Sequence, residues 1–230
     1  MVDIHTHIIP YVDDGSDALE KSIALLTEEA EKGVTAVCLT PHLRKGQFEK
    51  TDDEIRSAFE DFRAAAEKAN APVKLFLGRE IHIYDGMTDD FAKGKLITMG
   101  NGKCVLLEFP YDDYTDIDDV CYETSLLGYT PVIAHIERYS YFRDIGKAER
   151  VKRAGAKIQV NARSIVNPLS GGFNFVKKLL KEKLVDAVAS DVHYGRRNDL
   201  SEAYEKIADR DESYADKIFN EIPLRILSDN

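Results

Sequence analysis

The sequence has few cysteines, no long apolar run and fewer basic than acidic side chains. Its three cysteines, Cys38, Cys104 and Cys121, are widely spaced, which favours structural thiols in a reducing compartment over a disulfide framework. No stretch approaches the ~20 apolar residues of a membrane-spanning helix. Ionisable residues begin at Asp3, which leaves no room for a signal peptide. We therefore expect a cytoplasmic protein without membrane insertion.

The charge balance limits the classes of partner. There are 31 basic and 41 acidic side chains, which give a formal net charge of −10. This excess argues against broad binding to nucleic acid or to anionic membranes. No linker, low-complexity tract or internal repeat interrupts the chain, so we expect one domain over residues 1–230.

Short apolar runs recur along the chain, each followed by a polar loop and a helical pattern. This alternation is typical of repeated βα units and predicts an α/β fold. Seven units favour a distorted TIM-like (β/α)7 barrel, with an open doubly wound sheet as the alternative. The runs are Val2–Ile4, Ala36–Leu39, Lys74–Leu77, Lys103–Leu107, Pro131–Ala134, Lys157–Val160 and Asp186–Ala189.

Helices are predicted from capping residues and apolar periodicity. Asp17 with Glu20 predicts the start of one helix, and Thr51 with Glu54 predicts a capping box at the start of another. Later helices are expected near Ile117–Leu127, Lys147–Ala154, Phe173–Lys183 and Leu200–Ala208, with a shorter one before Pro223.

Imidazoles and carboxylates follow the predicted strands. In barrels of this kind, functional groups gather on the loops after the carboxyl ends of the strands. A cluster of acids and imidazoles at one edge would be electrostatically unfavourable without cations, because clustered carboxylates repel one another. The pattern therefore predicts bound metal ions. The candidate ligands are His5, His7, His42, Glu80, Glu108, His135, Asp191 and His193, with Asp14 as either a further ligand or a turn residue.

Nitrogen and oxygen donors without thiolate suit manganese, zinc or iron. Cations follow the same strand ends, and guanidinium groups beside metals suit an anionic substrate such as phosphate. We expect His82 to be a structural or pocket residue and Arg197 to be solvated or salt-bridged. The candidate substrate-binding cations are Arg44, Lys45, Arg138 and Arg196.

Seven segments carry a family resemblance. They are Asp3-Ile4-His5-Thr6-His7, Asp13-Asp14-Gly15, Thr40-Pro41-His42, Arg44-Lys45-Gly46, Gly78-Arg79-Glu80-Ile81, Pro131-Val132-Ile133-Ala134-His135-Ile136-Glu137-Arg138-Tyr139 and Ala189-Ser190-Asp191-Val192-His193. Together they resemble the PHP (polymerase and histidinol phosphatase) superfamily, and within it the CpsB/YwqE type of bacterial protein-tyrosine phosphatase. The resemblance extends from the first residues to the last predicted strand.

This resemblance implies a PHP-type barrel with a trinuclear centre, usually supported by manganese, with iron or zinc as alternatives. His5, His7, Glu80 and Asp191 would hold one ion, Glu80, Glu108 and His135 a second, and Asp14, His42 and His193 a third. Arg138 would contact the phosphoryl group, and the catalytic candidates are Arg138, Asp14, His42 and His193.

The implied substrate is phosphotyrosine on a tyrosine autokinase that controls capsule or exopolysaccharide synthesis. The cysteines lack an arginine at the Cys-x5-Arg spacing of thiol-dependent tyrosine phosphatases. Two enzyme alternatives are a PHP phosphatase for a small metabolite such as histidinol phosphate, and a PHP nuclease, which the net charge disfavours. The non-enzymatic alternative is a regulatory module that binds phosphotyrosine without hydrolysing it.

Overall fold

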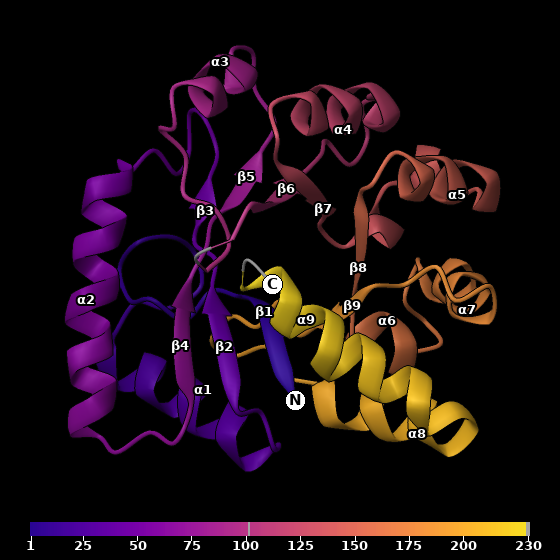
Figure 1. Cartoon of the computed structure of the whole chain (residues 1–230). Helices are drawn as coiled ribbons and strands as arrows, with labels where there is room; N and C mark the ends of the chain where they lie inside the picture. The colour runs from indigo at the N-terminus through magenta and orange to yellow at the C-terminus, as the bar shows by residue number, and fades with distance from the viewer. Residues whose placement is uncertain (101, 229–230) are drawn as a thin grey trace.

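Parallel strands form the inner layer of the structure, and helices pack around them (Figure 1). The computed structural model describes residues 1–100 and 102–228. The strands are β1 (Val2–Thr6), β2 (Ala36–Leu39), β3 (His42–Leu43), β4 (Lys74–Leu77), β5 (Glu80–His82), β6 (Cys104–Glu108), β7 (Thr130–Ile133), β8 (Lys157–Asn161) and β9 (Ala187–Ala189).

The strands pair in two sheets, in the orders β1-β2-β4 and β3-β5-β6-β7-β8-β9, which curl into a half-barrel (Figure 1). Between β1 and β9 the pairing is an isolated bridge of Thr6 with Val192. The predicted parallel α/β architecture is therefore confirmed. A continuous, fully closed barrel is not formed by residues 1–100 and 102–228.

Two of the seven predicted strands are interrupted and resume as β3 and β5, which the sequence pattern did not reveal. Pro41 separates β2 from β3 and has no N–H to donate to a neighbouring strand. Gly78 separates β4 from β5, and a Cβ atom there would lie 2.9 Å from Cys38 Sγ. Beyond these breaks the strands pair again, with His42 opposite Glu80.

Helices cover the outer surface of the strands. Their bounds agree with the predicted helices to within a few residues, with three exceptions. The helix α8 extends beyond its predicted end, α9 contains Pro223 whereas a helix before Pro223 was predicted, and α3 and α6 were not predicted. They are α1 (Leu19–Glu31), α2 (Asp52–Lys68), α3 (Met87–Ala92), α4 (Ile117–Leu126), α5 (Ile145–Arg153), α6 (Arg163–Val166), α7 (Phe173–Lys181), α8 (Leu200–Asp216) and α9 (Ile222–Ile226).

The two predicted helix starts have different outcomes. The capping box of Thr51 with Glu54 is present at α2 and is confirmed. The capping role of Asp17 is wrong, because α1 has Ala18 at its N-cap and no side-chain cap. Asp17 lies one residue too early, and its carboxylate instead accepts a hydrogen bond from Lys21 Nζ at 2.6 Å.

Two apolar clusters fill the interior. The larger lies between strands and helices, and the smaller is built from alternate strand residues such as Val2 and Ile4. Ile226 and Leu227, at the end of α9, pack into the smaller cluster. Within the described residues, no helix has the length and apolar character needed to cross a membrane.

Packing of the C-terminal helix into the interior can be tested with two leucines. Leu227 is 1% exposed, so Leu227→Ala should leave a cavity and lower the free energy of unfolding by about 2–5 kcal/mol. Leu224 is 48% exposed, and Leu224→Ala should change it by less than about 0.5 kcal/mol. Urea unfolding measures both, and equal effects would contradict the packing role of Leu227.

Candidate metal centre

The imidazoles of His5 and His7 lie on the same side of β1 and its extension. Alternate residues of an extended backbone share a face, and the two Nε2 atoms are 3.2 Å apart. Each Nε2 atom is also 3.2 Å from Glu80 Oε2. The two histidines therefore converge on one carboxylate.

Glu80 is fully buried and contacts two further imidazoles. Its Oε2 atom lies 2.9 Å from His42 Nδ1, and its Oε1 atom lies 2.9 Å from His135 Nε2. The same His135 nitrogen is 3.8 Å from Glu108 Oε1. Side chains from β1, from β3 and from the loops after β1 and β7 thus reach Glu80.

Asp14 and Asp191 extend the cluster. Asp14 Oδ1 is 3.5 Å from His42 Nε2 and 3.3 Å from His193 Nε2, and the side chain of Asp14 is 47% exposed. Asp191 Oδ1 lies 3.7 Å from His5 Nε2 and 3.6 Å from His7 Nε2. Asp14 therefore marks the solvent side of a cluster that is otherwise largely buried.

Two of these residues have unusual backbone conformations. His135 has φ 29° and Asp191 has φ 53°, in the left-handed region of backbone conformation that residues other than glycine rarely adopt. Such conformations cost about 1–3 kcal/mol each and persist only where the surroundings hold them. The His135 N–H donates to Gln159 Oε1 at 2.7 Å, and the Asp191 N–H donates to the His5 carbonyl at 3.0 Å.

Outer hydrogen bonds orient the imidazoles. His7 Nδ1 is 2.7 Å from Asp13 Oδ2, and His5 Nδ1 is 3.3 Å from Gln159 Oε1. His135 Nδ1 is 3.3 Å from the Tyr139 hydroxyl. A ring held through one nitrogen presents the other as a ligand, so all three Nε2 atoms face the carboxylates.

Three buried atoms of the cluster lack a hydrogen-bond partner among the described residues: Glu80 Oε2, Glu108 Oε2 and His42 Nδ1. Burial alone raises the pKa of Glu80, but the neighbouring His5 and His42 hold it well below its usual range. Burial lowers the pKa of His5, but Glu80 and Asp191 raise it to about 8. Buried carboxylate oxygens and imidazole nitrogens that face one another form a set of ligand atoms that divalent cations fit.

The donor atoms fall into three groups, each within 4.8 Å. They differ in part from the sets implied by the resemblance: His7 joins the group of Asp14, and His42 stands beside Glu80 and Glu108 where His135 was placed. Asp191 and His135 lie just outside these groups but within 4 Å of their members. The groups are His7, Asp14, His42 and His193; His5, His7 and Glu80; and His42, Glu80 and Glu108.

Of the candidate substrate-binding cations, Arg138 lies nearest to the cluster. Its guanidinium stacks 4.3 Å from the centre of the Tyr111 ring, and its Nη1 atom is 3.6 Å from Asp191 Oδ2. Lys45 lies 4.9 Å from the Tyr84 ring. Arg44 is half-buried and Arg196 is exposed, and neither makes an ion pair among the described residues.

Other expectations have clear outcomes. Arg197 forms ion pairs with Asp199 and Glu202, so its salt-bridged character is confirmed. His82 is half-buried, its Nδ1 atom is 3.1 Å from the Ile83 carbonyl oxygen, and it belongs to none of the three groups.

Several residues of the site were not identified from the sequence. Asp13 was passed over for its neighbour Asp14, and Tyr111 follows Glu108 by three residues. Gln159 and Asn161 lie on β8, the one predicted strand to which no functional residue was assigned, and Asn161 Nδ2 donates to Asp191 Oδ2 at 2.8 Å. Polar residues in an otherwise apolar run were the available signal for β8.

Comparison with known proteins extends over the whole chain. Residues 1–228 match the sequence model of a family described as capsular polysaccharide synthesis, CpsB/CapC. Tyrosine-protein phosphatase CpsB of Streptococcus agalactiae is 35% identical over 246 residues, covering 100% of this chain and 99% of that protein. Tyrosine-protein phosphatase YwqE of Bacillus subtilis is 31% identical over 84% of this chain and 77% of that protein.

Solved structures agree with these matches. One matching crystal structure comes from work on YwqE of B. subtilis and CpsB of Streptococcus pneumoniae, which are described there as metal-dependent tyrosine phosphatases. Its TM-score is 0.91 at 28% sequence identity, and the match covers 99% of this chain and 94% of that chain. The lactonase Lmo2620 of Listeria monocytogenes has a TM-score of 0.62 at 13% identity, covering 100% of this chain and 94% of that chain. The lactonase shares the fold alone.

The loop that carries Asp13 and Asp14 depends on Gly15. A Cβ atom at this position would lie 2.0 Å from the His7 carbonyl oxygen and 2.3 Å from His7 Cβ, so Gly15→Ala must displace the loop. We expect Mn²⁺ affinity, measured by calorimetry, to fall by about 10–100-fold. Gly171→Ala is the control, because its nearest neighbour would be 3.7 Å away. Unchanged affinity in Gly15→Ala would show that the loop does not support metal binding.

Proposed function

The chain belongs to the CpsB/CapC family of capsular polysaccharide synthesis, and from this membership we propose that it is a metal-dependent phosphatase that hydrolyses phosphotyrosine in proteins. The observation that carries the proposal is the convergence of four imidazoles on the buried carboxylate of Glu80. The full-length similarity to proteins named tyrosine-protein phosphatases supports the substrate class.

The proposed ligands of the metal centre combine imidazole nitrogen and carboxylate oxygen. This mixture suits manganese, iron or zinc, the family resemblance favours manganese among them, and three donor groups suit three ions. When bound, such ions lower the pKa of water to supply a nucleophile and stabilise negative charge on phosphoryl oxygens. The ligands are His5, His7, Asp14, His42, Glu80, Glu108, His135, Asp191 and His193.

Arg138 is the proposed phosphate-binding residue. Its planar guanidinium can donate two parallel hydrogen bonds to phosphoryl oxygens. The Tyr111 ring and Asp191 hold it beside the cluster, and Tyr111 itself donates a hydrogen bond to Glu108. Asp14, His42 and His193, at the solvent side, would complete the catalytic set, with Arg44, Lys45 and Arg196 as outer substrate contacts.

The cysteines do not suit a thiol mechanism. Cys38 and Cys121 are fully buried. Burial raises the pKa of both thiols, to about 12 for Cys121, which leaves almost no thiolate at neutral pH. Cys38 and Cys121 are therefore unsuited to act as nucleophiles, and the proposed hydrolysis rests on the metal centre.

Exposed aromatic residues favour a peptide substrate over a small polar metabolite. Tyr11, Tyr114 and Tyr194 are 64%, 70% and 49% exposed, and all three lie in loops that follow strands. Aromatic side chains with one apolar face and one polar tip are suited to protein contacts. A tyrosine autokinase of the capsule pathway is the proposed partner.

The first test is phosphate release from a phosphotyrosyl peptide. We expect EDTA to abolish activity, added Mn²⁺ to restore it, and His135→Ala to be inactive because a ligand contacting Glu80 and Glu108 is lost. His82→Ala, a histidine outside the cluster, should remain active. Faster release from histidinol phosphate would favour the metabolite phosphatase, and tight peptide binding without release would favour the regulatory module.

The role of Arg138 can be separated from general surface charge. Arg138→Ala should lower kcat/KM for the phosphopeptide by about 10²–10³-fold, because a donor to the charge that develops on phosphate is removed. Arg197→Ala removes a cation already paired with acidic residues and should leave kcat/KM unchanged. Equal losses in the two variants would mean that Arg138 acts only through the net charge of the rim.

A further inference from the structure

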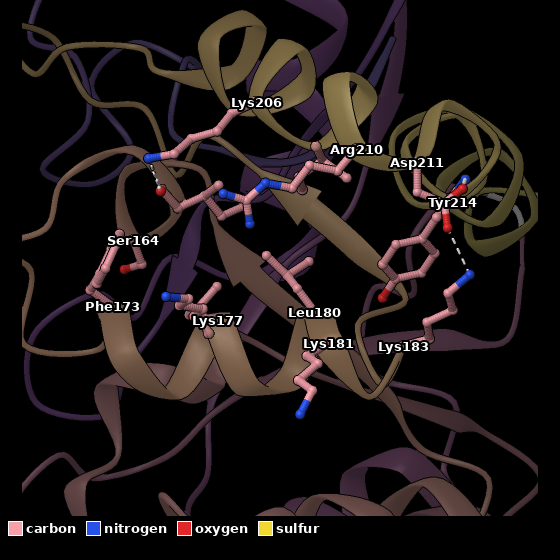
Figure 2. A pocket seen from close by; sticks show the side chains of 13 residues that line it. Ser164, Phe173, Lys177, Leu180, Lys181, Lys183, Lys206, Arg210, Asp211 and Tyr214 are labelled. Atoms are coloured by element: carbon pink, nitrogen blue, oxygen red, sulfur yellow. Dashed lines mark hydrogen bonds and ion pairs between the residues drawn. The ribbon is translucent and has the colours of Figure 1, made fainter.

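A second concave site lies on the outer layer, between helices α7 and α8. It is a cavity of about 410 Å³, within the ~300–1,000 Å³ range of small-molecule sites. Figure 2 shows its lining, in which Leu180 extends from α7 toward α8, the helix that carries Arg210. Among the described residues that line it, none belongs to the metal centre. We call it the α7–α8 cavity.

The inner wall of the α7–α8 cavity is apolar. Val176, Ile165 and Ile207 are 0%, 5% and 7% exposed, and the ring of Tyr214 is 8% exposed. Leu180 is half-buried in the same wall. Such a wall gains free energy when it exchanges water for an apolar ligand, by roughly 25 cal/mol per Å².

The rim of the cavity is basic. Lys177, Lys206 and Arg210 surround it, and Lys206 donates a hydrogen bond to the Ile165 carbonyl at 3.0 Å. In the part of the chain that the structure describes, Lys177 and Arg210 form no ion pair. Asp211 is the acidic residue of the lining, and it is already paired with Lys183 at 2.7 Å.

This arrangement is unusual in a chain whose formal net charge is −10. Lys177 and Arg210 line the same cavity, are exposed, and form no ion pair among the described residues. An anion at the rim would pair with these cations, while its apolar portion would cover the inner wall. The basic rim is therefore suited to the charged group of a ligand, and the apolar wall to the apolar part of the same ligand.

We propose that the α7–α8 cavity binds a small amphipathic organic anion, with its apolar body against Leu180, Ile207 and Tyr214 and its carboxylate, sulfate or phosphate group at Lys177 and Arg210. A free molecule fits better than a lipid surface. The apolar side chains are buried in a concavity and do not protrude, so they cannot insert into a bilayer.

Calorimetric titration of the full chain with decanoate tests the proposal, with decyltrimethylammonium as a cation of the same tail length, both below their micellar concentrations. We expect saturable one-to-one binding of decanoate and none of the cation. Lys177→Glu combined with Arg210→Glu should weaken decanoate binding by at least about tenfold, since charged hydrogen bonds are lost. Phosphatase activity should be unchanged.

Lys178→Glu is the matched control, because Lys178 is exposed on the same helix but does not line the cavity, and it should bind decanoate like the unmodified chain. Equal binding of anion and cation, an equal loss in Lys178→Glu, or no saturable binding would overturn the proposal. If the chain sediments with phosphatidylglycerol vesicles but does not bind free decanoate, the proposal is overturned in favour of a membrane contact. Thermal unfolding of each variant confirms that it is folded.

Discussion

The buried carboxylate of Glu80 is the interaction on which the site depends. A carboxylate taken out of water is costly unless charged partners surround it, and four imidazoles supply that environment here. These imidazoles come from β1, from β3 and from the loops after β1 and β7. Their common contact with Glu80 fixes where the strand ends must lie relative to one another.

Glu80 reaches this position because two strands are interrupted. The breaks at Pro41 and Gly78 let His42 and Glu80 lie opposite each other in the short pair β3 and β5. The same interruption divides the sheet and leaves the barrel ladder incomplete. A defect in regular strand pairing is therefore part of how the site is built, as expected where local regularity gives way to function.

Strained backbone and outer hydrogen bonds act together around the cluster. The positive φ values of His135 and Asp191 would relax if nothing held these loops. Gln159 contacts both His5 and His135, and Asn161 contacts Asp191, so β8 supports three proposed ligands without supplying one. Such support keeps ligands in place before a cation binds.

This acidic chain has two proposed anion-binding sites, one at the metal centre and one at the α7–α8 cavity. They differ in whether acidic side chains lie beside their cations. Arg138 is stacked on Tyr111 and lies near Asp191. These contacts suit a guanidinium that is held in position for the negative charge of a phosphoryl group. Lys177 and Arg210, at the α7–α8 cavity, form no ion pair among the described residues, and Asp211 in the same lining is paired with Lys183. Their charge is available to a resident ligand.

The parallel α/β architecture, the capping box of α2 and the common edge at which His5, His7 and His42 gather could all be predicted from the amino-acid pattern. These features follow from local patterns and from the rule that parallel strands end on the same side. The tertiary structure was needed to show that the barrel ladder is incomplete, that Asp17 does not cap α1, and that two helices enclose a basic cavity. It also decided the contact of Gln159 with His5, 154 residues apart in the chain. Such distances depend on packing between remote segments, and no local pattern encodes them.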